Sequence, residues 1–161
     1  MMAHYGKFDG VNNYIALVGE KSKSDESLGY YGEQIVLKAQ ELGLNTCWVA
    51  MTHGKSKAQI DKGEKLVCLI SLGYGKTAGA AHKSKKLSEV CNYKKDMPEW
   101  FLSGMEAALL APTEMNGQKF YFELLPDNSI KITCGKGLYT KLDLGIVKYH
   151  FEVVSGKVNW K

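Results

Sequence analysis

The sequence predicts an α+β fold. Segments with the 3.6-residue period of amphipathic helices and short apolar runs typical of strands occur together, but they do not alternate in the regular way of a βαβ protein. A turn between two alternating segments near the middle of the second half predicts a hairpin. With 161 residues, 45% of them hydrophobic, the chain is long enough for one core. We therefore expect a single domain over residues 1–161.

The first half is predicted to hold one long helix among strands. Between Glu26 and Leu42 apolar residues recur every three or four positions, as in an amphipathic helix. Ser24 or Asp25 is placed to cap its start, and Gly43 is placed to end it in a left-handed conformation. Apolar runs predict strands or extended segments at residues 12–19, 45–51 and 65–75.

The second half begins with a lysine-rich connection that leads through Pro98 into a predicted helix over residues 99–110. A strand over residues 119–125, a turn at 126–129 and a strand over 130–134 predict a hairpin. The last predicted helix spans residues 143–153, with Leu144, Val147 and Phe151 on one face.

Charge and composition disfavour nucleic acid as a partner. The net charge is +4, and all 21 basic residues are lysines. Arginine, which supplies the planar fork that grips bases and phosphates, is absent from the sequence. The lysines are scattered, apart from a small cluster at Lys83, Lys85 and Lys86. A nucleic-acid interface usually needs a denser basic footprint.

The cysteines and the N-terminal residues indicate a cytoplasmic protein without a membrane anchor. The four cysteines show no CxxC pair and no metal-ligand spacing, so we expect free thiols in a reducing compartment. The first residues lack the apolar stretch of a signal peptide, and no apolar run reaches the length of a membrane span. The four histidines are far apart, which gives no reason to expect a metal.

Three segments are candidate sites, each with a plainer interpretation beside it. Residues 41–51 end a helix and become extended around Trp48; they form either an edge of the core or a backbone edge that lies along a flat heterocycle. If residues 82–87 are extended, Lys83 and Lys85 point to one side and can clasp a phosphate; otherwise they form a solvated loop. Residues 71–79 contain Gly73 and Gly75, but their spacing is not GxGxxG and no periodic helix follows.

A further candidate is the junction at residues 109–125, where an apolar helical run stops at Ala111-Pro112 and the predicted strand begins at residue 119. Thr113, Glu114, Asn116 and Gln118 crowd into this junction. They form either a helix stop with a turn or a surface that faces a ligand. No serine has the surroundings of a nucleophile elbow, so an enzyme of this sequence would leave the difficult chemistry to a bound cofactor.

Taken together, these segments resemble signatures of the nitroreductase family of flavoproteins. The matching stretches are "LGLNTCWVAM", "LISLGYG" followed by "HKSKKL", and "APTEMNGQKFYF". The complete order, with "DLGIVKYHFE", is similar to a subgroup of nitroreductases related to a Thermotoga protein. The resemblance covers nearly the whole chain and implies an antiparallel or mixed central sheet flanked by helices.

The resemblance also implies FMN as cofactor and assigns residues to it. Trp48, Val49, Ala50 and Met51 would run along the flavin edge, and Lys83 and Lys85 would hold the phosphate. Ring or ribityl atoms would be contacted by Thr113, Asn116 and Gln118. NADH or NADPH would donate the hydride, no side chain would act as a catalytic nucleophile, and a homodimer is expected because relatives place the flavin at a dimer interface or between repeats.

Two departures from the family pattern accompany these assignments. The Asn-x-Gln motif follows the flavin-edge strand here, whereas it precedes that strand in typical members. Relatives also begin with an arginine-rich segment that completes the phosphate site, and the chain is expected to be an N-terminally truncated member. One hypothesis is therefore an FMN-dependent oxidoreductase that reduces nitroaromatic or quinone-like acceptors. The alternative is a nitroreductase-fold protein without flavin that serves as an oligomerising or ligand-binding module.

Overall fold

The computed structural model describes residues 11–51, 56–77, 79–156 and 159–161. Within them the chain forms five strands, four α-helices and one 3₁₀ turn. Their bounds are β1 (Asn13–Glu20), α1 (Glu26–Glu41), β2 (Asn45–Val49), β3 (Glu64–Gly73), α2 (Leu87–Val90), α3 (Glu99–Ala108), η1 (Glu114–Asn116), β4 (Phe120–Leu124), β5 (Ile130–Cys134) and α4 (Thr140–Ser155).

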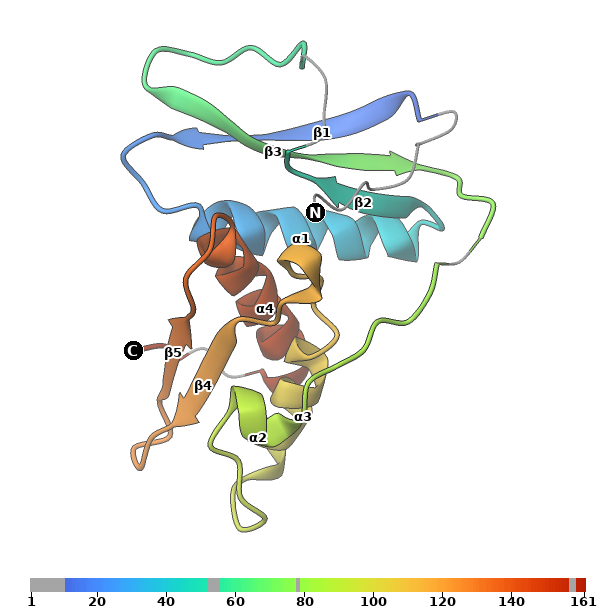
Figure 1. Cartoon of the computed structure of the whole chain (residues 1–161). Coiled ribbons are helices and arrows are strands. Elements are labelled where there is room, and N and C mark those ends of the chain that lie inside the picture. Colours follow the sequence, from blue (N-terminus) through green and yellow to red (C-terminus); the bar gives the residue numbers. More distant parts are fainter. Residues whose placement is uncertain (1–10, 52–55, 78, 157–158) are drawn as a thin grey trace.

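The first three strands form an antiparallel sheet in the order β1-β3-β2, and α1 lies along one face of it (Figure 1). The register places Leu17 opposite Cys68 and Trp48 opposite Ile70. Because side chains alternate along a strand, these four residues share the face that meets α1. The side chains of Leu17 and Trp48 pack so closely on Gly32 of α1 that a Cβ there would lie 2.5 Å from the indole ring.

Helices α1 and α4 touch backbone to backbone. A Cβ on Gly29 of α1 would lie 2.0 Å from the carbonyl oxygen of Leu142, and a Cβ on Gly145 of α4 would lie 1.9 Å from that of Glu26. These two glycines therefore set how closely the helices approach. Figure 1 shows the consequence: the sheet lies on one side of α1, and α4 lies on the other with α3 and the β4–β5 hairpin.

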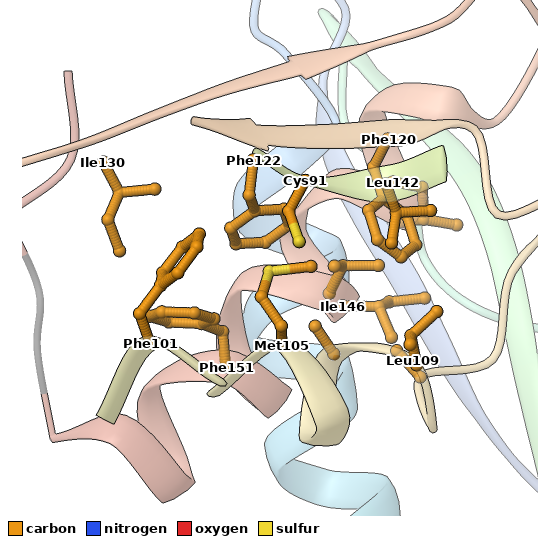
Figure 2. Close-up of a cluster of buried hydrophobic side chains, with 14 of the residues drawn as sticks. Cys91, Phe101, Met105, Leu109, Phe120, Phe122, Ile130, Leu142, Ile146 and Phe151 are labelled. Carbon is orange, nitrogen blue, oxygen red and sulfur yellow. The ribbon is translucent and has the colours of Figure 1, made fainter. Parts of the chain in front are cut away.

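The hairpin, α3 and α4 enclose an aromatic core (Figure 2). Phe122 of β4 stacks on Phe151 of α4 with the ring centroids 5.2 Å apart, and Phe101 of α3 packs on Phe151 at 6.0 Å. All three rings are fully buried. Phe151 reaches them across Gly104, where a Cβ would lie 2.5 Å from its ring.

The predicted elements are confirmed, with differences at their ends. Gly43 adopts the expected positive φ of 78°, and β3 stops at Gly73 without a helix after it. Helix α4 begins at Thr140, three residues before the predicted start. The Asp25 side chain pairs with Lys65 at 2.7 Å and makes no capping bond; Ser24 Oγ accepts the backbone N–H of Glu26 instead.

The short α2 and η1 were not predicted from the sequence. Four residues are too few for a helical period to show, and η1 contains backbone conformations that its residue types do not signal. Within the described ranges, no helix is long and apolar enough to cross a membrane.

The contact between the two helices predicts an unusual response to alanine. In an ordinary helix interior Gly→Ala stabilises by about 1 kcal/mol. Gly29→Ala should instead lower the free energy of unfolding by about 3 kcal/mol or more, because its Cβ meets a backbone carbonyl that cannot turn aside. Urea unfolding followed by circular dichroism measures the change.

Gly73→Ala is the matched control, since a Cβ there meets nothing within 4 Å and the residue ends a strand. We expect its effect to stay within about 0.5 kcal/mol. A Gly29→Ala variant as stable as the wild type would contradict the close backbone contact.

Candidate functional site

Strand β2 carries the first group of predicted site residues at the edge of its sheet. Among the described strands it pairs with β3 alone, so its outer backbone edge has no strand neighbour. The Trp48 side chain faces α1, whereas Val49 lies on the other face of the sheet and is buried. Met51 is 61% exposed. The strand therefore offers an extended backbone, while its largest side chain belongs to the core.

Trp48 also fixes β2 to both long helices. Its indole Nε1 donates to Oε2 of Glu33 on α1 at 3.2 Å, and Oε1 of the same carboxylate bonds His150 Nε2 of α4 at 2.8 Å. Glu33 is only 1% exposed. A buried carboxylate is tolerated when its oxygens have partners, and this one links β2, α1 and α4.

A small cavity lies where the end of β2 meets the start of α4. Its volume is about 70 Å³. Its walls come from β2, β3, the junction at residues 112–114 and the N-terminal part of α4. They include predicted site residues from two motifs, the segment at 45–51 and the junction. The lining residues are Trp48, Ala50, Cys68, Pro112, Thr113, Glu114, Tyr139, Leu142, Asp143 and Ile146. Pockets for cofactor-sized ligands enclose roughly 300–1,000 Å³, so this cavity cannot admit a flavin ring.

Asp143 is a buried acidic residue in the cavity wall. The backbone N–H of Glu114 donates to both of its carboxylate oxygens at 3.1 Å. Burial raises the pKa of Asp143 to about 6, against the opposing effect of that N–H bond. Burial also raises the pKa of Cys68 to about 12, so its thiol stays protonated and is no nucleophile at neutral pH. The pKa of Tyr139 is raised as well, mainly by burial.

The polar junction bonds to a distant part of the same chain. Gln118 is 2% exposed, and its side-chain Oε1 accepts the Lys85 N–H at 2.8 Å while its Nε2 donates to the Lys83 carbonyl at 2.7 Å. Asn116 Nδ2 donates to the same Lys83 carbonyl at 2.9 Å. Thr113 Oγ1 accepts the Gln118 backbone N–H at 3.0 Å. The crowded polar side chains thus tie the lysine segment to the junction.

The backbone of this junction is strained. Met115, Asn116 and Gln118 have φ values of 50°, 53° and 45°, in the left-handed region that favours glycine. Each such residue costs of order 1 kcal/mol or more unless its surroundings hold it there. The hydrogen bonds from Thr113 and from the lysine segment supply that hold.

The structure therefore brings seven of the nine predicted residues into one continuous region. Trp48, Ala50 and Thr113 line the cavity, and Thr113 leads through its bond with Gln118 to Asn116, Lys83 and Lys85. Val49 and Met51 lie outside the cavity wall. The roles of all nine as flavin contacts stay predictions.

The donor set fits the phosphate end of FMN. Lys83 and Lys85 are exposed on a segment that is neither helix nor strand and that runs as an elongated trace in Figure 1. Ammonium groups are suitable partners for a phosphate dianion. Lys85 Nζ also donates to the Gln118 carbonyl at 3.0 Å. The ring finds no enclosed space in this region, so it would lie on the surface along the backbone of β2. Within the described part of the chain, no group of three or more His, Cys, Asp or Glu side chains is placed to hold a metal ion.

Sequence reasoning missed Asp143, Tyr139 and the Glu33–His150 pair. Asp143 could have been identified from the sequence, because it stands between Leu142 and Leu144 in an apolar helical segment, where an acidic residue is unusual. The Glu33–His150 pair joins residues 117 positions apart, and no local sequence pattern predicts it.

Comparison with known proteins relates the chain to nitroreductases. Residues 1–155 match the model of the family described as "Putative TM nitroreductase". No curated protein matches the chain. Among solved structures, the crystal structure of a putative nitroreductase from Thermotoga maritima MSB8 has a TM-score of 0.72 and 23% sequence identity. The match covers 93% of this chain and 66% of the Thermotoga chain, so this chain spans just under two thirds of that length. It confirms the predicted fold.

The buried acid predicts a pH dependence of stability. The folded-state pKa of Asp143, about 6, lies above its ordinary value of 3.8, so ionisation favours the unfolded chain. The stability associated with the neutral acid is complete below about pH 4 and is lost as the pH rises to about 6. Asp143→Asn removes the charge and keeps an oxygen for the Glu114 N–H. Its free energy of unfolding relative to wild type should therefore rise by about 2 kcal/mol between pH 4 and pH 7.

Urea unfolding at a series of pH values measures this difference. Asp96→Asn, in the exposed loop before α3, makes the same charge change and serves as the control. Parallel pH profiles for wild type and Asp143→Asn would contradict a raised pKa at Asp143.

Proposed function

The chain belongs to the family described as putative TM nitroreductase, and from this membership we propose that it is an FMN-dependent oxidoreductase. It would accept hydride from NADH or NADPH and reduce nitroaromatic or quinone-like acceptors. When bound, FMN supplies the capacity to store a hydride and release it to a second substrate. The chain itself contributes binding and orientation.

The observation that carries the proposal is the convergence of three motifs. The segment at 45–51, which contains β2, the lysine segment at 82–87 and the polar junction at 112–118 are separated in sequence by at least 25 residues. In the folded chain, β2 and the junction share the cavity wall, and the junction is hydrogen-bonded to the lysine segment. A flat, phosphorylated ligand needs both an edge and an anion site, and the segments that would supply them lie in one region of the fold.

Two parts of the chain have distinct tasks in this proposal. The backbone edge from Trp48 to Met51 would hydrogen-bond the rim of the flavin ring, since the side chain of Trp48 is engaged in the core. Lys83 and Lys85 would neutralise the phosphate. Thr113, Asn116 and Gln118 would act from the border of the site, where the structure gives each of them a partner in the chain.

A homodimer completes the proposal. A flavin ring lying along β2 would have one face against this chain and needs a second wall to exclude water. The cavity of about 70 Å³ does not provide that wall, and a second copy would.

The phosphate role predicts a large effect of the lysines on FMN retention. Charge-assisted contacts contribute about 1.5–3 kcal/mol each, so replacing both Lys83 and Lys85 with Gln should weaken FMN binding at least about 100-fold. The visible absorbance of FMN-loaded protein after gel filtration, and fluorescence titration of FMN, measure the loss. The control replaces Lys94 and Lys95 with Gln, an equal change of charge on the exposed loop after α2.

The outcomes separate the proposal from its alternative. Flavin retained at about one per chain by the wild type and the control, but not by the Lys83/Lys85 variant, supports the flavoprotein. A wild type that stays colourless after loading refutes it and favours a flavin-free oligomerising or ligand-binding module. That alternative rests on the internal partners that already occupy Asn116 and Gln118.

The predicted assembly is checked by sedimentation velocity at micromolar chain concentration. We expect a dimer of 17.9 kDa chains that becomes tighter when FMN is added, because the flavin would contact both copies. A monomer with and without FMN would contradict the shared site.

A further inference from the structure

The side-chain amide of Gln118 replaces a strand partner for residues 83–85. A neighbouring strand offers one acceptor and one donor to a residue pair, and the Gln118 amide does the same with Oε1 to the Lys85 N–H and Nε2 to the Lys83 carbonyl. A third bond joins Asn116 Nδ2 to that carbonyl, and Asn116 Oδ1 accepts the Gln118 Nε2 at 2.8 Å. We call these two amide side chains and their bonds the amide clasp.

The lysine segment is fixed from its other side as well. His82 Nε2 bonds the Leu109 carbonyl at 2.8 Å, and Ser84 Oγ donates to the same oxygen at 3.2 Å. His82 and Ser84 therefore face the end of α3. Because side chains alternate along an extended chain, Lys83 and Lys85 share the opposite side. The backbone between two exposed lysines is thus held at both flanks.

We propose that Gln118 and Asn116 are positioning residues that fix Lys83 and Lys85 as a binding element for a phosphomonoester. They do this by holding residues 83–85 extended, and they do not need to touch the ligand. Identifying the phosphate as that of FMN rests on the proposed function. The anion-binding role of the clasped segment does not, since any phosphomonoester dianion presents the same charge and acceptors.

The strain in the junction supports a positioning role. A connection between α3 and β4 needs no left-handed Met, Asn and Gln, yet Met115, Asn116 and Gln118 all adopt positive φ. This conformation directs both amides at one carbonyl of a segment 33 to 35 residues away. Strain that is held by the surrounding structure is found most often at binding sites.

The test compares FMN with riboflavin, which has the same ring and no phosphate. Fluorescence titrations of both flavins are made on the wild-type chain and on Gln118→Leu. The matched control is Asn92→Leu, because the Asn92 amide makes the same pair of bonds with Leu124, Nδ2 to the carbonyl at 3.1 Å and Oδ1 from the N–H at 2.9 Å. Both changes remove a side-chain amide that pairs with backbone, but only one removes it from the lysine segment.

We expect Gln118→Leu to weaken FMN at least about tenfold and riboflavin less than about twofold, which is the loss of one charged contact without a change in ring binding. Asn92→Leu should change neither. Asn116→Gly is a milder variant, because glycine accepts the positive φ of that position; it should weaken FMN about threefold. It carries the test if Gln118→Leu does not fold. Equal losses for FMN and riboflavin, or unchanged FMN binding in both clasp variants, would overturn the proposal.

A titration with inorganic phosphate separates this proposal from the proposed function. Amide ¹H–¹⁵N spectra of the wild type should show shifts at residues 83–85 that saturate with phosphate, and the clasp variants should lose them. If the wild type binds neither flavin but shows these shifts, the flavoprotein proposal fails and the clasp proposal stands. If phosphate produces no shifts at residues 83–85 and FMN binds no better than riboflavin, the clasp proposal fails.

Discussion

The contact between α1 and α4 is the constraint on which the arrangement of the molecule depends. The three-stranded sheet packs on α1, whereas α3 and the hairpin pack on α4, so the two halves meet through this pair of helices. Gly29 and Gly145 let the backbones touch, and Lys148 pairs with Glu26 across the same contact at 2.5 Å. Because the approach is so close, the first turn of α4 lies beneath the end of β2. The cavity with Asp143 in its wall follows from that placement.

The polar junction shows how a cluster of hydrogen-bonding residues can have a purely internal explanation. Among the described residues, every buried side-chain nitrogen and oxygen has a partner within the chain. Gln118 and Asn116 therefore do not need a ligand to account for their burial or their bonds. The case for a flavin comes from the family and from the convergence of three motifs, and the junction contributes to it by holding the lysine segment in place.

The sequence was sufficient for the elements and insufficient for the contacts between them. Apolar periodicity located α1, β3, α4 and the hairpin, because the spacing of apolar residues within a short segment indicates which of its faces is buried. The η1 turn and the conformation of Gln118 after it were missed, since Met and Gln are residue types that rarely adopt positive φ. The bond from Gln118 to the lysine segment joins side chain to backbone across 33 residues. No periodic pattern and no local composition in the sequence predicts such a bond.

The absence of arginine explains why a lysine phosphate site would need such support. A guanidinium is a rigid planar fork that brings its own geometry to a phosphate, whereas an ammonium is a point charge on a flexible stem. A site built from lysine must therefore obtain its order from the backbone that carries it. Residues 83–85 have that order, since the amide clasp holds one side and the Leu109 carbonyl holds the other. In the proposed function, the main chain of residues 83–85 thus supplies the fixed geometry that an arginine side chain would otherwise bring to the phosphate. The positive φ values of Met115, Asn116 and Gln118 are the backbone strain that accompanies this arrangement.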